Sequence, residues 1–371
     1  MRGSVSKHSL PIKLWFRSMP LSIKKWWEAA LKHFIKNLST NLFQKYLSHD
    51  SATRIFSERV RANTQRIGVN KNIPSPYYSY KSENVISFRD DIVFITGRFR
   101  SGSSVFWNVF RAQNDCTAYY EPFNERRWFD VKHRGSFVDN SHKGIDDYWS
   151  EYDNLEHLSN LYNEKWINTA LHMDENSYDI NMHAFINSLI ENAKGRPVLQ
   201  FNRIDFRLPW LRKHYPNAKF LHIYRNPRNQ WLSFLTDKQK MNAVDVQNTY
   251  QDAFYLDVWC KDLSQQFPFL CPKVTPHPYT RFYYLWKLSY LYGTKYCDYS
   301  VALEELTSSP QQTLCKIKNL LNWNTFDTGN STQVIHDLSG NKWVNYAEVS
   351  WFEQREVACE LELDNYFGNR K

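Results

Sequence analysis

Glycine is scarce in this chain, which has 11 glycines among 371 residues, against a usual share of about 7%. A loop that contains two glycines is therefore conspicuous. The six cysteines form neither a CxxC pair nor a cluster with histidine at metal-ligand spacing, so we interpret them as buried thiols of a reducing compartment. No run approaches the roughly 20 apolar residues of a membrane span, and the N-terminus lacks the apolar core of a signal peptide. The sequence therefore predicts a cytoplasmic protein.

Acidic residues are few near the start of the chain. Residues 1–70 contain 13 Lys and Arg but three acids, a net charge of +10, whereas the rest of the chain is close to neutral. Within this region, residues 21–47 place aromatic and aliphatic side chains at helical spacing between lysines. A basic amphipathic helix can lie on an anionic membrane or bind a polyanion. We expect residues 1–85 to form a basic helical extension that packs on the main domain, with peripheral membrane contact as the alternative.

The first motif of the main domain is a strand, a turn and a helix. Overall composition, 42% hydrophobic and 23% charged, is that of a folded protein. Residues 91–96 are an apolar run typical of a buried parallel strand. They lead into Gly97–Ser104, after which apolar residues recur at helical spacing. Such a turn directs backbone N–H groups and a helix N-terminus at a phosphate.

This turn resembles a Walker A loop only in part. The spacing from Gly97 to Gly102 fits, but Ser103 and Ser104 stand where a nucleotide triphosphatase has Lys-Ser/Thr. The loop supplies Arg98 and Arg100 instead, whose planar guanidinium groups suit oxyanions. The missing lysine argues against a kinase, although a kinase with a degenerate Walker loop remains a lesser alternative.

A second strand–turn–helix segment covers residues 219–234. Its first half is apolar and β-branched, and Pro227 fits the start of a helix. Arg225 should therefore leave the carboxyl edge of the strand, and Ser233 should lie two turns into the helix. Ligands of doubly wound sheets bind at the carboxyl ends of the strands. Both segments are therefore expected to line the same crevice at the carboxyl edge of the sheet.

Together the two segments resemble the sulfotransferase superfamily, whose members use 3′-phosphoadenosine 5′-phosphosulfate (PAPS). Gly97–Ser104 is similar to the 5′-phosphosulfate loop, in the Arg-Ser-Gly-Ser-Ser form found in carbohydrate sulfotransferases. Residues 221–233 are similar to the 3′-phosphate segment. Glu121-Pro122 after a second expected strand, and a strand–helix at 301–310, also agree with the family.

The resemblance covers about residues 90–325 and implies the fold. We expect a P-loop NTPase-like, three-layer α/β domain with a central parallel sheet over residues 86–371. Helical insertions are expected near 124–195 and 241–296, and these should form the acceptor pocket. The loop type and the 16% aromatic content suggest an acceptor hydroxyl on a carbohydrate or glycoconjugate, such as a glycolipid. Neither a metal nor a nucleic-acid partner is expected.

The resemblance also implies roles for individual residues. Arg100 matches the loop cation, expected to stabilise the transition state of an in-line transfer. Glu121 is the expected general base. The residues expected to bind PAPS are Arg98, Arg100, Ser101, Gly102, Ser103, Ser104, Arg225 and Ser233.

For several residues the sequence leaves two interpretations of their role open. Glu121 could instead only pair with Arg126 or Arg127, and His133 or His142 could serve as the base. Arg203 could reach the crevice or form a salt bridge near Asp205, the interpretation we favour, and residues 340–343 could close over the nucleotide or form a surface turn. A non-enzymatic alternative is an inert sulfotransferase-like protein that binds a nucleotide, a polyanion or a membrane.

Overall fold

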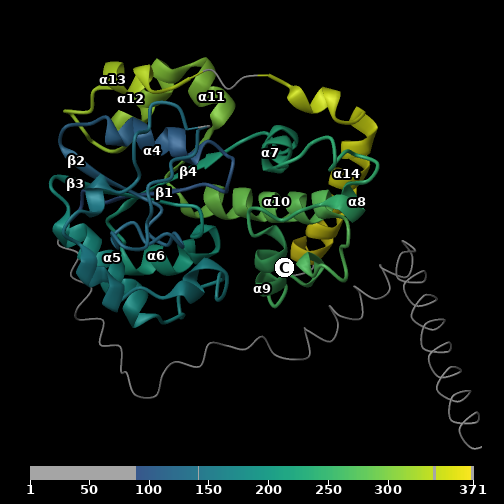
Figure 1. The fold of residues 1–371 in the computed structure, drawn as a ribbon, viewed down its shortest axis with the longest axis horizontal. Coiled ribbons are helices and arrows are strands. Elements are labelled where there is room, and N and C mark those ends of the chain that lie inside the picture. Colours follow the sequence, from purple (N-terminus) through teal and green to yellow (C-terminus); the bar gives the residue numbers. More distant parts are fainter. Residues whose placement is uncertain (1–88, 141, 337–339, 369–371) are drawn as a thin grey trace, which may run out of the picture. The chain divides into compact units, whose positions relative to one another are not determined.

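The computed structural model describes residues 89–140, 142–336 and 340–368 (Figure 1). They belong to the second of the two units into which the chain divides, residues 64–371. The predicted basic extension, residues 1–85, lies outside the described residues. In the part that is described, no helix combines the length and the apolar character that crossing a membrane requires.

The centre of the domain is a five-stranded sheet in which every pair of neighbouring strands is parallel. The strand order is β2-β3-β1-β4-β5. The strands are β1 (Val93–Thr96), β2 (Cys116–Tyr120), β3 (Arg196–Phe201), β4 (Lys219–Tyr224) and β5 (Tyr299–Ala302). The motifs at 91–96 and 219–234 therefore supply the two adjacent central strands, β1 and β4.

Helices cover both faces of this sheet (Figure 1). Helix α4 lies on one side together with α11, α12 and α13, and helices α5, α6 and α10 lie on the other. The described helices are α4 (Ser103–Arg111), α5 (Ile180–Asn192), α6 (Leu208–His214), α7 (Pro227–Phe234), α8 (Val246–Thr249), α9 (Leu256–Leu263), α10 (Pro278–Tyr296), α11 (Leu303–Ser308), α12 (Pro310–Leu320), α13 (Thr328–Gln333) and α14 (Val349–Gly368). The prediction of a three-layer α/β domain with a central parallel sheet is confirmed.

Strand β1 sets the position of the carboxyl edge. Its last residue, Thr96, is level with Phe201 at the end of β3 and with His222 in β4. Phe94 is fully buried and stacks on Phe220 with 4.9 Å between the ring centroids. Apolar packing on both faces fixes the register of a central parallel strand. The loops after β1, β3 and β4 therefore leave the sheet along one edge.

Helix α10 shows that the range 241–296 contains part of the layered domain. It packs on β4 and β5, on one of the two sheet faces that carry helices. Its aromatic side chains Tyr279, Phe282 and Tyr283 are buried, as expected for core residues. At Gly293 a Cβ would lie 2.3 Å from Nδ1 of His222, so only glycine allows this close approach of the helix to the sheet.

Candidate active site

A cavity of about 290 Å³ lies at the carboxyl ends of the strands. Its wall takes Arg100 and Ser103 from the segment after β1, Glu121 after β2, Asn202 after β3 and Arg225 after β4. This is the position at which open parallel sheets bind ligands. The structure brings together most of the predicted site residues there: Arg100, Gly102, Ser103, Ser104, Glu121, Arg225 and Ser233.

The N-terminus of α4 opens onto this cavity without a side-chain cap. Gly102 precedes the helix with φ 95°, no side chain in the described chain caps the first turn, and that turn contains no acid. A Cβ on Gly102 would lie 2.5 Å from Cδ1 of Leu303, so the turn requires glycine in this position. The first N–H groups of a helix have no intrahelical acceptor and carry positive potential. They form an anion-binding surface.

Arg100 links the loop to α7. Its Nε donates a hydrogen bond to Oγ of Ser233 at 3.0 Å, and its Nη1 lies 3.6 Å from Oδ2 of Asp139. The guanidinium carbon is 5.8 Å from the ring centroid of Phe254. Two residues predicted for different phosphates of the donor, Arg100 and Ser233, are thus in direct contact.

Arg225 presents an unsatisfied donor. Its Nη1 donates to the carbonyl oxygen of Arg100 at 3.5 Å, but its buried Nε has no hydrogen-bond partner among the described residues. Burial lowers the pKa of Arg225, Glu304 opposes this, and the charge on Arg100 lowers the pKa further. The indole Nε1 of Trp286 donates to the Arg225 carbonyl oxygen at 3.0 Å and fixes the backbone. An anion bound in the cavity would neutralise the charges of both Arg100 and Arg225.

Arg98 and Ser101, both predicted as donor ligands, do not line the cavity. Arg98 is 9% exposed, its Nη1 lies 3.4 Å from Asp205, and its guanidinium carbon is 4.2 Å from the ring centroid of Trp259. Ser101 is 1% exposed, and its N–H bonds back to the Arg98 carbonyl oxygen at 3.1 Å. This turn buries the side chains of Arg98 and Ser101, while Arg100 between them reaches the cavity.

Glu121 is held by three donors at the carboxyl end of β2. It accepts hydrogen bonds from Nη1 of Arg203 at 2.8 Å, from Nδ2 of Asn124 at 3.2 Å and from Nδ2 of Asn202. Arg203 also donates to Glu125 at 2.7 Å. Burial raises the pKa of Glu121, and the Arg203 charge opposes that shift. The site thus contains a carboxylate with an ionic partner and a stronger affinity for protons than a free glutamate.

The partners considered for Glu121 and Arg203 from the sequence are not those the structure shows. Glu121 pairs with neither Arg126 nor Arg127, and Arg127 instead contacts Glu164. Asp205 pairs with Arg98. The favoured salt bridge of Arg203 near Asp205 is therefore wrong, because Arg203 bridges two acids of the β2 loop.

Backbone strain accompanies two of these residues. Arg100 has φ 65° and Glu121 has φ 40°, values uncommon for residues with a side chain. Such conformations persist where the surrounding contacts enforce them, and they are frequent at functional sites.

Of the two candidate histidines one lines the cavity, whereas Trp343 of the predicted C-terminal loop lies outside its wall. His142 lines the cavity, its Nδ1 lies 2.6 Å from the Tyr148 hydroxyl, and burial lowers its pKa. His133 is exposed beside Asp130 and does not line the cavity. Trp343 packs on Phe352 outside the cavity wall.

Other wall residues were not anticipated from the sequence. They are Val105, Tyr120, Asn124, Trp128, Phe137, Asp139, Tyr148, Phe254 and Leu303. Most belong to the two insertions, where no motif indicates which side chains face the sheet edge.

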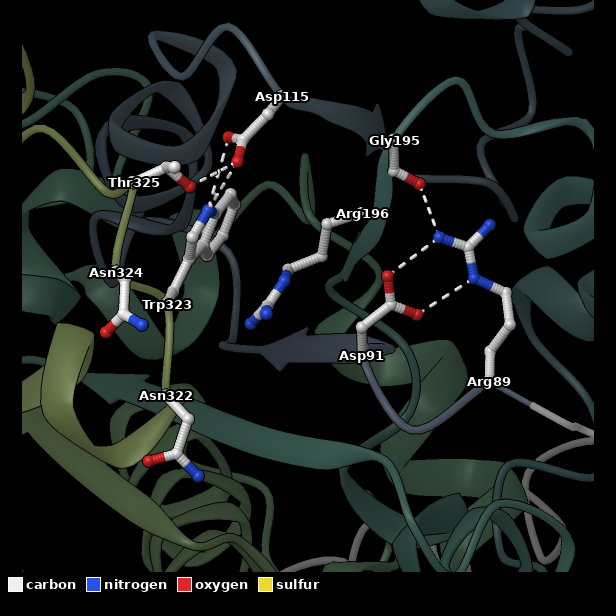
Figure 2. A pocket seen from close by; sticks show the side chains of 9 residues that line it. All are labelled: Arg89, Asp91, Asp115, Gly195, Arg196, Asn322, Trp323, Asn324 and Thr325. Atoms are coloured by element: carbon white, nitrogen blue, oxygen red, sulfur yellow. Dashed lines mark hydrogen bonds and ion pairs between the residues drawn. The ribbon is translucent and has the colours of Figure 1, made fainter.

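A second cavity, of about 380 Å³, lies at the opposite, amino ends of β1 to β3 (Figure 2). Asp91 accepts two hydrogen bonds from Arg89, at 2.8 and 2.7 Å. Asp115 accepts from the Trp323 indole, over whose ring the Arg196 guanidinium lies at 4.4 Å. Both carboxylates are already paired, so this cavity is a structural junction between the strand starts and the segment at 321–325.

The sulfotransferase family model matches residues 92–284, more than half of the chain. The chain therefore belongs to the sulfotransferase family, which confirms the resemblance and identifies a transferase of sulfuryl groups. A sulfotransferase from Alicyclobacillus acidocaldarius is similar over 71% of this chain and 95% of its own, at 16% identity and a TM-score of 0.31. This structural likeness adds nothing to the family assignment. A comparison with curated proteins finds no match.

Proposed function

We propose that this protein transfers the sulfuryl group of PAPS to a hydroxyl group of a carbohydrate or glycoconjugate. The observation that carries the donor assignment is that Arg225, which forms no ion pair among the described residues, lines the same cavity as the uncapped N-terminus of α4. Two separate anion-binding features in one cavity suit a nucleotide with phosphate groups on both its 3′ and 5′ positions. PAPS would supply the activated sulfuryl group.

The residues of the chain divide between the two ends of such a donor. Arg100 and the N–H groups at the start of α4 would hold the 5′ end and stabilise charge that develops there. Arg225 and Ser233 would hold the 3′-phosphate. Arg100 donates to Ser233 through Nε at 3.0 Å, and this bond uses neither the Nη groups of Arg100 nor the hydroxyl hydrogen of Ser233, which can donate to the phosphates of the donor.

Glu121 is the proposed general base. Arg203 favours its charged form, and its raised pKa makes it a better proton acceptor than a free glutamate. His142 is the second candidate, because its lowered pKa keeps the imidazole neutral near pH 7 and it lines the same cavity.

The donor assignment is tested by calorimetric titration of the full chain with 3′-phosphoadenosine 5′-phosphate and with ADP. We expect the 3′-phosphorylated nucleotide to bind at least about 100-fold more tightly, because two charge-assisted contacts depend on its 3′-phosphate. Equal affinities would contradict the donor assignment. Preference for ATP with Mg²⁺ would revive the kinase alternative, and binding without any sulfuryl transfer would support the inert alternative.

Asp139 is expected to compete with the donor for Arg100. Its carboxylate lies 3.6 Å from Nη1 of Arg100 and is 42% exposed. We expect Asp139→Asn to tighten 3′-phosphoadenosine 5′-phosphate binding about three- to five-fold, the size of one partly exposed ion pair. The control is Asp153→Asn, which removes a carboxylate 3.6 Å from Arg134 outside the cavity wall. Equal affinities of the two variants would contradict this role of Asp139.

A further inference from the structure

Part of the cavity wall has no role in the proposed donor contacts. The loop at Gly102 and helix α7 supply those contacts, whereas the first insertion adds Arg126, Trp128 and Phe137 to the wall. Glu121 contributes to the same cavity. If the loop and α7 hold the donor, as proposed above, the wall residues of the insertion are left to contact the acceptor. The inference below rests on that proposed function.

Arg126 differs from the neighbouring arginines in having no acidic partner. Arg127 contacts Glu164, and Arg134 lies 3.6 Å from Asp153. Within the described part of the chain, the guanidinium of Arg126 makes no hydrogen bond or ion pair; its carbon lies 5.1 Å from the ring centroid of Phe137. A planar guanidinium that lines a cavity without a partner is suited to a carboxylate or a sulfate ester.

The acids of the cavity wall do not neutralise Arg126. The Asp139 carboxylate lies beside Arg100, and Glu121 pairs with Arg203. Arg126 is therefore a cation of the cavity wall that no acid of the described residues neutralises.

Phe137 adds an apolar face beside this charge. It is 58% exposed although it lines the cavity, and its ring lies beside the Arg126 guanidinium. A flat aromatic ring next to a guanidinium fits a sugar ring that carries an anionic substituent.

We propose that Arg126 and Phe137 form an acceptor subsite that selects an anionic saccharide. Arg126 binds a carboxylate or sulfate ester of the acceptor, and Phe137 packs against the ring that carries it. In this proposal both residues select the acceptor, and neither takes part in donor binding or in the proton transfer.

The test measures acceptor binding separately from donor binding. The full chain is saturated with 3′-phosphoadenosine 5′-phosphate and titrated with a hexasaccharide of alternating glucuronic acid and N-acetylglucosamine. The matched probe is the same hexasaccharide after reduction of its carboxyl groups. We expect the acidic form to bind about tenfold more tightly than the reduced form, because only it can form the charge-assisted bonds.

Variants test whether Arg126 and Phe137 cause the preference for the acidic hexasaccharide. Arg126→Gln is expected to remove the tenfold difference and to leave affinity for 3′-phosphoadenosine 5′-phosphate unchanged. Phe137→Ala is expected to weaken both saccharides by the same factor. The control, Arg127→Gln, removes an adjacent arginine that lies outside the cavity wall and should preserve the preference.

Each contrary outcome has a distinct meaning. Equal binding of the two saccharides, or no binding of either, overturns the subsite. An equal loss in Arg126→Gln and Arg127→Gln also overturns it, because general attraction to basic groups would then explain the preference. Failure of 3′-phosphoadenosine 5′-phosphate itself to bind contradicts the proposed function instead.

Discussion

Replacement of Glu121 by glutamine is expected to lower kcat about 10²- to 10⁴-fold, the usual contribution of a general base. The amide keeps the shape of the side chain but cannot accept a proton near neutral pH. The measurement is transfer of labelled sulfate from PAPS to the saccharide acceptor that wild type uses best. Affinity for 3′-phosphoadenosine 5′-phosphate should stay within about threefold, since Glu121 is not among the proposed donor contacts.

The pH dependence separates the two candidate bases. Burial raises the pKa of Glu121, so activity should increase as pH rises through that value, which lies above the range of a free glutamate. This limb should disappear in Glu121→Gln. If His142 were the base, the limb would persist in Glu121→Gln and vanish in His142→Gln.

A matched control addresses the structural role of the Glu121–Arg203 pair. Glu125→Gln also removes one carboxylate partner of Arg203, but Glu125 is 45% exposed and does not line the cavity. If Glu121 only anchors Arg203, both variants should reduce turnover to the same small extent. A near-normal kcat for Glu121→Gln would move the base to another residue.

The parts of the site that sequence predicted are those encoded by contiguous segments. Gly97–Ser104 and residues 219–234 each contain a strand end, a turn and a helix start, so their position at the sheet edge follows from local pattern. The same pattern could not separate Arg98 from Arg100. Which of two arginines faces the cavity depends on a turn between Arg98 and Ser101 and on a buried acid more than 100 residues away, Asp205.

Long-range pairing accounts for the remaining differences. Glu121 and Arg203 lie 82 residues apart and meet only because β2 and β3 are neighbours in the sheet. Arg126 and Phe137 come from an insertion with little regular structure near them. No periodicity marks such residues, so their place at the cavity is visible only in three dimensions.

Replacement of Arg225 by alanine is expected to weaken binding of 3′-phosphoadenosine 5′-phosphate by about 100-fold or more while leaving ADP affinity nearly unchanged. The guanidinium is the group proposed to meet the 3′-phosphate, and a buried charge-assisted contact is worth far more than an exposed one. Calorimetric titration of both nucleotides into the variant measures the difference. Ser233→Ala should cause a smaller loss, because a hydroxyl contributes one neutral donor.

The control for this variant is Arg228→Ala in the first turn of α7, three residues after Arg225. Arg228 donates two hydrogen bonds to Glu356, at 2.9 and 2.7 Å, and does not line the cavity. Loss of its charge should leave both nucleotides bound as in wild type, even though net charge falls equally in the two variants. If Arg225→Ala weakened both nucleotides to the same degree, Arg225 would support the cavity without reading the 3′-phosphate. Discrimination between PAPS and ordinary adenine nucleotides would then have to come from another part of the wall.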